Sequence, residues 1–331
     1  MSLTSQLKNR NSPVCQFFSA HEHKQGMTES IAFLLSSHPF LQTEFVPPFY
    51  VYGIIGTASD YLIRYIANGN KINFKKIIAA EAVKRGEFFD FLEDEDYSSY
   101  LRVLFDIGQF GLRGQTATSS EAIVSSLALA LLDNYYRSGL LPKAFFDRLS
   151  ASERKKIRSI QYGKSYQDKK IFYQLFKYLE DIGGDLLVRE IAAIANLFET
   201  GLQDSQSEIY GIKFEVYNKA LYYSNLVGGA DFDCVIRHKG AHILTEIKTI
   251  KKNLNIDYLR QLLGYSLLYS RSKDRFSSTH LGVYYSRACS FRYVSVDFLI
   301  TKCFPTFVSS GAARAAFRKF LKESTEMEEF S

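Results

Sequence analysis

The chain has 331 residues, of which 46% are hydrophobic and 23% are charged, with a net charge of +6. This composition is that of a globular protein with one large domain or two, and it excludes disordered, collagen-like and coiled-coil classes. The four cysteines show no CxxC spacing, which argues against a zinc ribbon or a disulfide framework. No apolar leader is visible and the most apolar stretch, residues 123–132, is too short to cross a bilayer, so we expect a cytoplasmic protein without membrane contact.

The first two thirds of the sequence are predicted to be mostly helical. Residues 1–50 have an irregular pattern with some helix. A helix is then expected from Gly56 to the Asn-Gly stop at residues 68–69, because apolar residues recur at helical spacing between them. Helical periodicity continues from about residue 71 to residue 204. It is clearest over residues 75–94, 120–139 and 185–201.

After about residue 205 the pattern changes to strands interrupted by helices. One helix is expected over residues 256–270, and the final segment, residues 312–331, is predicted to be a helix with an acidic end. Strand-type composition covers residues 212–223, 230–238, 241–250, 280–288 and 291–300. The chain is therefore predicted to be α-rich first and α/β second.

Positive charge is concentrated in residues 148–170, which contain eight Lys or Arg residues and two acidic residues. Such a segment can attract a polyanion, although a solvated helix face is the commoner explanation of a charge run. If the segment binds nucleic acid, the cluster of basic residues within it is the expected contact: Arg154, Lys155, Lys156 and Arg158.

The stretch that bears most on chemistry is residues 228–252, GGADFDCVIRHKGAHILTEIKTIKK. A hairpin centred between Lys239 and Gly240 would place Asp233 opposite Glu246, with their Cβ atoms about 5 Å apart. Lys248 shares the face of Glu246, and Asp231 shares the face of Asp233, because side chains on a strand alternate. One face would then carry two or three carboxylates and a lysine.

Carboxylates held this closely raise one another's pKa, and a divalent cation relieves that repulsion. Hard oxygen ligands favour Mg²⁺ or Mn²⁺, and a neighbouring lysine can hold a water molecule or a phosphate oxygen. The arrangement suits metal-assisted hydrolysis of a phosphodiester. A surface hairpin with a cross-strand ion pair is the simpler alternative.

The order of these motifs resembles the PD-(D/E)xK nuclease superfamily, and within it the nuclease domain of the RecB helicase–nuclease group. The spacing from Asp233 to Glu246-Ile-Lys248 is similar to that of the group's metal-binding strands. Gln261-Leu-Leu-Gly-Tyr265 resembles its QxxxY helix, and Gly56-Thr-Ala-Ser-Asp60 resembles its GxxxH helix, with aspartate in place of histidine. The similarity covers residues 56–68 and 205–300.

The resemblance implies a role for each matching residue. Asp233 and Glu246 would hold Mg²⁺ or Mn²⁺, with Asp60 as a further ligand, and Asp231 could substitute for Asp233. Lys248 would orient or activate the attacking water. Gln261 and Tyr265, which lie one helical turn apart on one face, would help to fix the site and the nucleic-acid backbone.

The expected fold class is α/β (α+β), with a restriction-endonuclease-like core in which helices flank a mixed sheet. Residues 1–55 form an N-terminal region, residues 56–70 and 205–331 form the nuclease core, and residues 71–204 form a large helical insertion. The expected activity is hydrolysis of DNA, with RNA less favoured. The alternatives are a catalytically inactive binding or scaffolding protein and a hydrolase of small phosphate compounds. The sequence does not identify protein partners, substrate structure or oligomeric state.

Overall fold

The computed structural model describes residues 2–42, 49–93, 97–139, 152 and 184–329. Contacts divide the chain into two compact units. The sheet unit consists of residues 1–40 and 204–331, and the helical unit consists of residues 41–203. Within the described residues, no helix is both long enough and apolar enough to cross a membrane.

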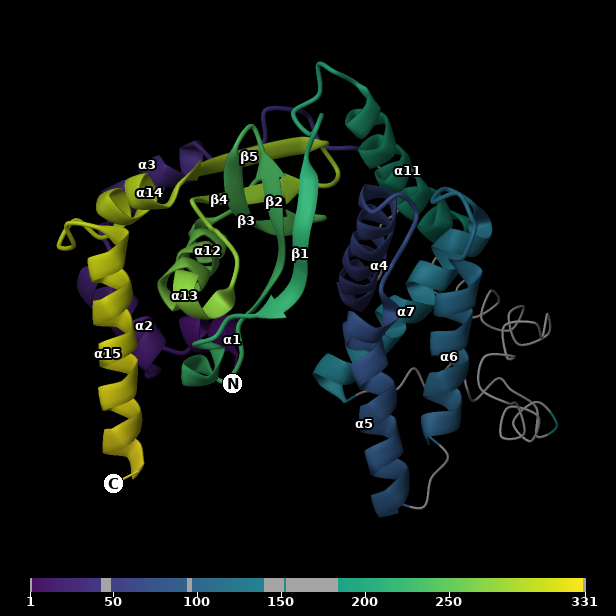
Figure 1. Ribbon diagram of the computed structural model, residues 1–331, viewed down its shortest axis with the longest axis horizontal. Coiled ribbons are helices and arrows are strands. Elements are labelled where there is room, and N and C mark those ends of the chain that lie inside the picture. The colour runs from purple at the N-terminus through teal and green to yellow at the C-terminus, as the bar shows by residue number, and fades with distance from the viewer. Residues whose placement is uncertain (1, 43–48, 94–96, 140–151, 153–183, 330–331) are drawn as a thin grey trace. The chain divides into compact units, whose positions relative to one another are not determined.

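The sheet unit contains a five-stranded mixed sheet with the strand order β1-β2-β3-β4-β5 (Figure 1). All neighbouring pairs are antiparallel except β3 and β4, which run parallel. The strands are β1 (Lys213–Ala220), β2 (Asp231–His238), β3 (Ala241–Lys248), β4 (His280–Tyr285) and β5 (Ser290–Ser295). The predicted mixed sheet flanked by helices is thus confirmed at the level of a general α/β architecture.

The parallel pair requires a crossover connection, and helix α12 (Ile256–Leu268) supplies it. The helix begins where the predicted helix begins, because the Asn255 side chain accepts a hydrogen bond from the Tyr258 amide at 3.2 Å and Asp257 lies in the first turn. Short helix α13 (Arg271–Asp274) follows α12 before the chain enters β4.

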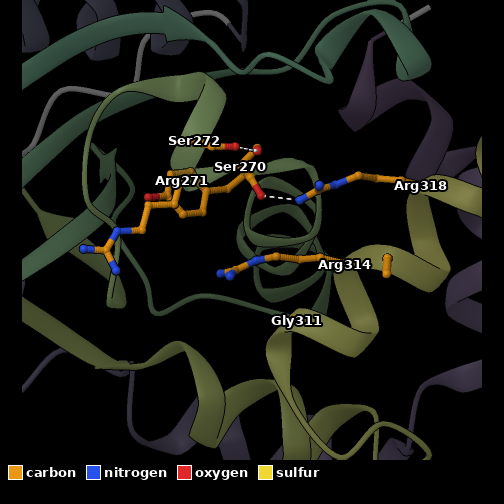
Figure 2. A pocket seen from close by; sticks show the side chains of 8 residues that line it. Ser270, Arg271, Ser272, Gly311, Arg314 and Arg318 are labelled. Atoms are coloured by element: carbon orange, nitrogen blue, oxygen red, sulfur yellow. Dashed lines mark hydrogen bonds between the residues drawn. The ribbon is translucent and has the colours of Figure 1, made fainter.

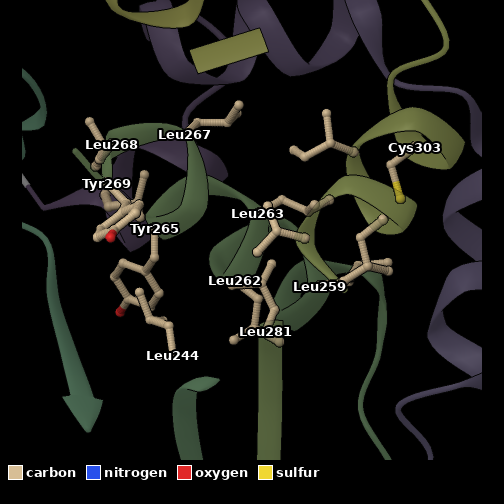
Figure 3. Close-up of a cluster of buried hydrophobic side chains, with 14 of the residues drawn as sticks. Leu244, Leu259, Leu262, Leu263, Tyr265, Leu267, Leu268, Tyr269, Leu281 and Cys303 are labelled. Carbon is tan, nitrogen blue, oxygen red and sulfur yellow. The ribbon is translucent and has the colours of Figure 1, made fainter. Parts of the chain in front are cut away.

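The core of the sheet unit lies between one face of the sheet and helices from both ends of the sequence. Leu244 of β3 and Leu281 of β4 belong to the same buried cluster as Leu259, Leu262 and Leu263 of α12 (Figure 3). Burying a leucine side chain contributes about 1.5–3 kcal/mol, so this contact fixes α12 on the sheet. The remaining helices of the unit are α1 (Leu3–Lys8), α2 (Pro13–His21), α3 (Lys24–Ala32), α14 (Val296–Cys303) and α15 (Ser310–Glu329).

One strand prediction is corrected by the structure. Residues 291–300 were expected to form a single strand, but β5 ends at Ser295 and α14 starts at Val296. Asp297 lies in the first turn of this helix, where a carboxylate is favourable. Val296, Leu299 and Ile300 are buried in the core cluster, a helical spacing that the apolar composition of the segment concealed.

The helical unit is organised around α7 (Ser120–Ser138), which packs against the other described α-helices of the unit. These are α4 (Phe49–Ala67), α5 (Ile78–Glu93), α6 (Tyr97–Gly111) and α11 (Gly184–Gln203). The apolar segment at residues 123–132 is buried within α7, which is followed by the C-cap Gly139 in the left-handed region with φ 71°.

The first helix of this unit differs from its prediction in length. It begins at Phe49, seven residues before Gly56, and ends just before the Asn-Gly stop. Its contacts are with α7 and α11, so residues 56–67 fall in the helical unit. The predicted grouping of residues 56–70 with residues 205–331 in one nuclease core stays a prediction.

Candidate active site

The hairpin of β2 and β3 has the register that the sequence predicted. His238 pairs with Ala241 across a two-residue turn, in which Lys239 and Gly240 have φ angles of 46° and 80°. Positive φ at both positions is the signature of a tight hairpin turn, and Gly240 adopts it without steric cost. The pairing continues to Cys234 and Thr245. One further step in the same register places Asp233 opposite Glu246.

The Asp233 carboxylate reaches across to β3. Its Oδ2 accepts a hydrogen bond from the Ile247 amide at 2.7 Å. Asp233 is half-buried, whereas Glu246 is only 3% exposed. The two carboxylates are close enough for the charge of Asp233 to raise the pKa of Glu246.

Glu246 and Lys248 form a buried ion pair on β3. The distance from Lys248 Nζ to Glu246 Oε2 is 2.6 Å. Glu246 Oε1 is also buried and accepts no hydrogen bond of ordinary geometry from a described residue, although the Tyr265 hydroxyl is close enough to help lower the pKa of Glu246. A buried acceptor that is left unsatisfied costs about 1–3 kcal/mol, and more when it is charged. Among the atoms of the site, this oxygen would therefore be stabilised most by a bound ligand.

Helix α12 covers this pair with three side chains. Gln261 Oε1 lies 3.5 Å from Lys248 Nζ, and Gln261 Nε2 donates a hydrogen bond to the Tyr265 hydroxyl at 2.7 Å. Lys248 Nζ also lies 4.8 Å from the centroid of the Tyr258 ring, where a cation is attracted by the ring face. The lysine is thus held from both the strand and the helix.

The electrostatics of the site are dominated by burial. Burial, with the charge of Asp233, raises the pKa of Glu246 to about 7, against the lowering effect of Lys248. Burial acts to lower the pKa of Lys248, but attraction to Glu246 and Asp233 outweighs it, and the pKa lies above its ordinary value. Burial also raises the pKa of Tyr265, so its hydroxyl stays protonated.

The two carboxylates suit a hard divalent cation. Mg²⁺ takes oxygen ligands and is commonly held by one or two carboxylates, with water completing the coordination shell. The unsatisfied Oε1 of Glu246 and the adjacent Asp233 carboxylate fit that requirement. No cluster of three or more His, Cys, Asp or Glu side chains with metal-binding geometry occurs among the residues that the structure describes.

Asp60, the proposed further ligand, lies on α4 in the helical unit. Both of its carboxylate oxygens accept hydrogen bonds from Arg64, one turn further along the helix. Arg64 is 5% exposed, so this is a largely buried pair. A cation at Asp60 would have to compete with the Arg64 guanidinium, and ligation by Asp60 stays a prediction.

The other predicted residues lie at the edge of the site or beyond the described part of the chain. Asp231 is exposed at the start of β2, where it pairs with Ala220 of β1, and its role as a substitute ligand stays a prediction. Four predicted nucleic-acid contacts lie outside the described residues: Arg154, Lys155, Lys156 and Arg158.

Sequence reasoning missed Tyr258. The signal was present, because Tyr258, Gln261 and Tyr265 follow the i, i+3, i+7 spacing of one helix face. The resemblance drew attention to the last two residues alone. The Tyr258 ring lies beside Lys248. Tyr258 belongs to the same face of α12 as Gln261 and Tyr265.

No family model and no curated protein compared with this sequence matches it.

Proposed function

We propose that this protein is a metal-dependent nuclease that hydrolyses phosphodiester bonds in DNA. The observation that carries the proposal is the buried Glu246 carboxylate, which has an unsatisfied Oε1 next to a second carboxylate and a lysine. Further support comes from the order of the elements. An antiparallel hairpin carries Asp233 and Glu246-x-Lys248, and the crossover helix that follows carries Gln261 and Tyr265.

Asp233 and Glu246 would hold Mg²⁺ or Mn²⁺, which when bound supplies positive charge to the scissile phosphate and favours ionisation of water. The metal would also lower the pKa of Glu246, because a cation stabilises the ionised carboxylate. The mutual repulsion of the two carboxylates would then no longer oppose the fold.

Lys248 contributes through its position 2.6 Å from Glu246 Oε2. Its ammonium group would hold the attacking water or a non-bridging phosphate oxygen, where negative charge develops as the water oxygen bonds to phosphorus. The attacking water gives up a proton to the solvent, the bond from phosphorus to the leaving oxygen breaks, and that oxygen takes up a proton from the solvent. Preorganised charge of this kind commonly contributes about 3–4 kcal/mol to transition-state stabilisation.

Gln261 and Tyr265 would act as positioning residues for Lys248. The Gln261 side chain is fixed by its bond to the Tyr265 hydroxyl, and its Oε1 faces the lysine. Tyr258 restricts the ammonium from the helix side. A fixed lysine reaches the reacting oxygen without reorganisation, which is how enzymes keep electrostatic stabilisation effective.

The test is incubation of the full chain with plasmid DNA and with single-stranded DNA, in Mg²⁺, in Mn²⁺ and in EDTA. We expect cleavage that requires the metal and is lost in Glu246→Gln, because the amide cannot supply an anionic ligand. Asp257→Asn, which removes an exposed carboxylate at the start of α12, is the matched control and should cut normally. Binding of DNA without metal-dependent cleavage would reject the nuclease and favour the binding protein. Cleavage of only small phosphate compounds would favour the third alternative.

A further inference from the structure

A pocket with an arginine-rich lining lies where α13 faces α15 within the sheet unit. Its volume is about 650 Å³, and its lining includes Arg271, Arg314 and Arg318, together with Ser270 and Ser272 (Figure 2). This volume is far larger than a water molecule needs, and the pocket is shallow and open to solvent. We call these residues the arginine pocket.

Two of the arginines are held in place by the C-terminal end of α12. Arg314 Nε donates to the Ser266 carbonyl at 2.9 Å, and Arg318 donates to the Leu267 and Tyr269 carbonyls. The last carbonyls of a helix lack partners within the helix and favour cations. Backbone carbonyls therefore fix the two guanidinium groups beside each other. Because these carbonyls are neutral, they do not cancel the positive charge of the arginines.

Hydrogen-bond donors remain available in the pocket. Arg314 Nη1 makes no hydrogen bond to a described residue, and the same is true of the whole guanidinium of Arg271. Burial lowers the pKa of Arg314, and so does the nearby charge of Arg318. Two like charges held together with spare donors are stabilised by a bound anion.

Two carboxylates are near the pocket, but both are engaged by other groups. Asp274 is 1% exposed and accepts hydrogen bonds from the Tyr222 and Ser270 amides at 2.7 Å each. Asp297 accepts from the Ser310 amide at 3.2 Å, and hydrogen bonding to Ser310, with the charge of Arg314, lowers its pKa. Neither carboxylate forms an ion pair with Arg271, Arg314 or Arg318 within the described residues.

The surface beside the pocket combines aromatic rings with further positive charge. Arg318 lies 4.3 Å from the centroid of the Tyr223 ring, which is packed edge-on against Tyr222 at 5.0 Å. Tyr222 is 54% exposed, and Lys273 lies 5.5 Å from its centroid. A second recess continues from Arg318 along α15 and includes Lys319 and Lys322, together with Glu323, whose Oε1 lies 3.7 Å from Lys319 Nζ.

We propose that the arginine pocket binds a backbone phosphate of a single nucleic-acid strand, with Tyr222 positioned to stack on an unpaired base. The choice of nucleic acid as the ligand rests on the proposed nuclease function. The arginine pocket would be a second contact region for that ligand, in addition to the candidate active site. Arginine forks match phosphate oxygens, and tyrosine rings next to basic grooves are a common arrangement for single-strand binding.

The chemistry of the surface favours a nucleic acid over an anionic membrane. The exposed aromatic side chain is a tyrosine flanked by a lysine, and the arginines lie in a recess. Membrane-surface binding instead uses an apolar helix face that enters the lipid. On α15 the apolar residues Ala313, Phe317 and Leu321 are buried in the protein core.

The test is fluorescence anisotropy of the full chain with a labelled single-stranded oligodeoxynucleotide, in EDTA so that no metal-dependent cleavage occurs. Arg271→Gln removes an exposed donor that has no hydrogen bond to a described residue. We expect this variant to bind the oligonucleotide about tenfold more weakly, because it would lose one charge-assisted hydrogen bond to phosphate. The log–log salt slope should fall by about 0.7, the value for one phosphate contact on a single strand. Lys213→Gln, an exposed lysine at the start of β1, is the matched control and should bind normally.

A second variant tests the single-strand specificity. Tyr222→Ala should weaken binding to the single strand about tenfold and leave binding to a duplex of the same sequence unchanged, because stacking needs an unpaired base. Equal losses on both substrates would overturn the single-strand assignment.

The remaining outcomes separate this inference from the nuclease proposal. Equal affinity of Arg271→Gln and Lys213→Gln, or no oligonucleotide binding by the wild type, would overturn it. Arg271-dependent binding to phosphatidylcholine–phosphatidylserine vesicles, without such dependence for the oligonucleotide, would assign the pocket to a membrane. Arg271-dependent binding without any cleavage in Mg²⁺ would support the pocket and reject the nuclease.

Discussion

Each unit of this protein contains a buried carboxylate with a raised pKa, and the two are accommodated differently. In the helical unit, Asp133 accepts a hydrogen bond from the Tyr61 hydroxyl at 2.8 Å, and burial raises its pKa to about 6. In the sheet unit, Glu246 has a pKa of about 7, a lysine partner, a second carboxylate nearby and one unsatisfied oxygen.

The difference shows what distinguishes a candidate site from a buried polar contact. Burial raises the pKa at both positions, and at Glu246 the charge of Asp233 adds to this effect. At Asp133 the neutral Tyr61 hydroxyl donates a hydrogen bond to the carboxylate. This pair is accounted for by the packing of α4 on α7. At Glu246 the neighbours leave an acceptor unpaired and place charge of both signs around it.

The largest expected effect is on catalysis. Lys248→Ala should slow cleavage by about 10²–10³, since it removes charge that stabilises the transition state. Tyr61→Phe, in the helical unit, should leave the rate unchanged at a temperature where the protein is folded. Cleavage rate and melting temperature should be measured on the same preparations. A Lys248→Ala protein that melts earlier but cuts at the wild-type rate would make the lysine a structural residue.

The second-largest expected effect is on the pH dependence of stability, which should distinguish Glu246 from Asp133. The pKa of Glu246 is raised on folding, so the folded protein binds a proton more tightly than the unfolded chain. In EDTA, stability relative to Glu246→Gln should be greatest below about pH 4.5 and fall as pH rises to about 7. The loss should approach roughly 3 kcal/mol.

Asp133 provides the matched comparison for that experiment. Relative to Asp133→Asn, wild-type stability should fall in the same direction but in a lower window, from about pH 3.8 to about pH 6. Urea unfolding of the three proteins across this range measures both effects. Identical pH profiles for wild type and Glu246→Gln would show that Glu246 does not titrate abnormally.

The stabilisation produced by added metal should also distinguish Glu246 from Asp133. Mn²⁺ at a hundred times its Kd should stabilise the wild type by about 2.7 kcal/mol through binding to the folded state. Glu246→Gln should lose most of this gain, whereas Asp133→Asn should keep it. Thermal unfolding with and without Mn²⁺ gives the answer, and equal stabilisation of both variants would place the metal elsewhere.

The smallest expected effect is structural and confined to the helical unit. Tyr61→Phe leaves Asp133 without its donor, which should cost about 1–2 kcal/mol of unfolding free energy. Tyr136→Phe, at a ring that is 39% exposed, is the matched control and should cost less. Urea unfolding measures the difference. Equal losses would mean that the Tyr61–Asp133 bond contributes nothing beyond packing.

The parts of the site that were predictable are local in sequence. The turn residues set the hairpin register, and that register places Asp233 opposite Glu246 without knowledge of any other element. The helix predicted over residues 256–270 is observed as α12, which begins at the predicted residue and ends two residues earlier. Strand alternation and helix periodicity are enough for such features, because each involves neighbours within a few residues.

The parts that were not predictable depend on distant contacts. The burial of Oε1 and the cover provided by Tyr258 require α12 to dock on the sheet. The arginine pocket joins Arg271 to Arg314 and Arg318, more than forty positions later, and no local pattern connects them. In β5 and α14, apolar composition favoured one strand, and the change at Ser295 follows from packing in the core.

The interrupted course of the sheet unit has a consequence for synthesis on the ribosome. The ring of Phe17 on α2 packs edge-on against Phe317 on α15, 300 positions later, and also contacts Phe304. At about 5–20 residues per second, roughly 15–60 s separate the emergence of Phe17 from that of Phe317. Before that interval ends, the helical unit, which is continuous in sequence, has been synthesised in full, while α2 still lacks the partners that bury its aromatic face.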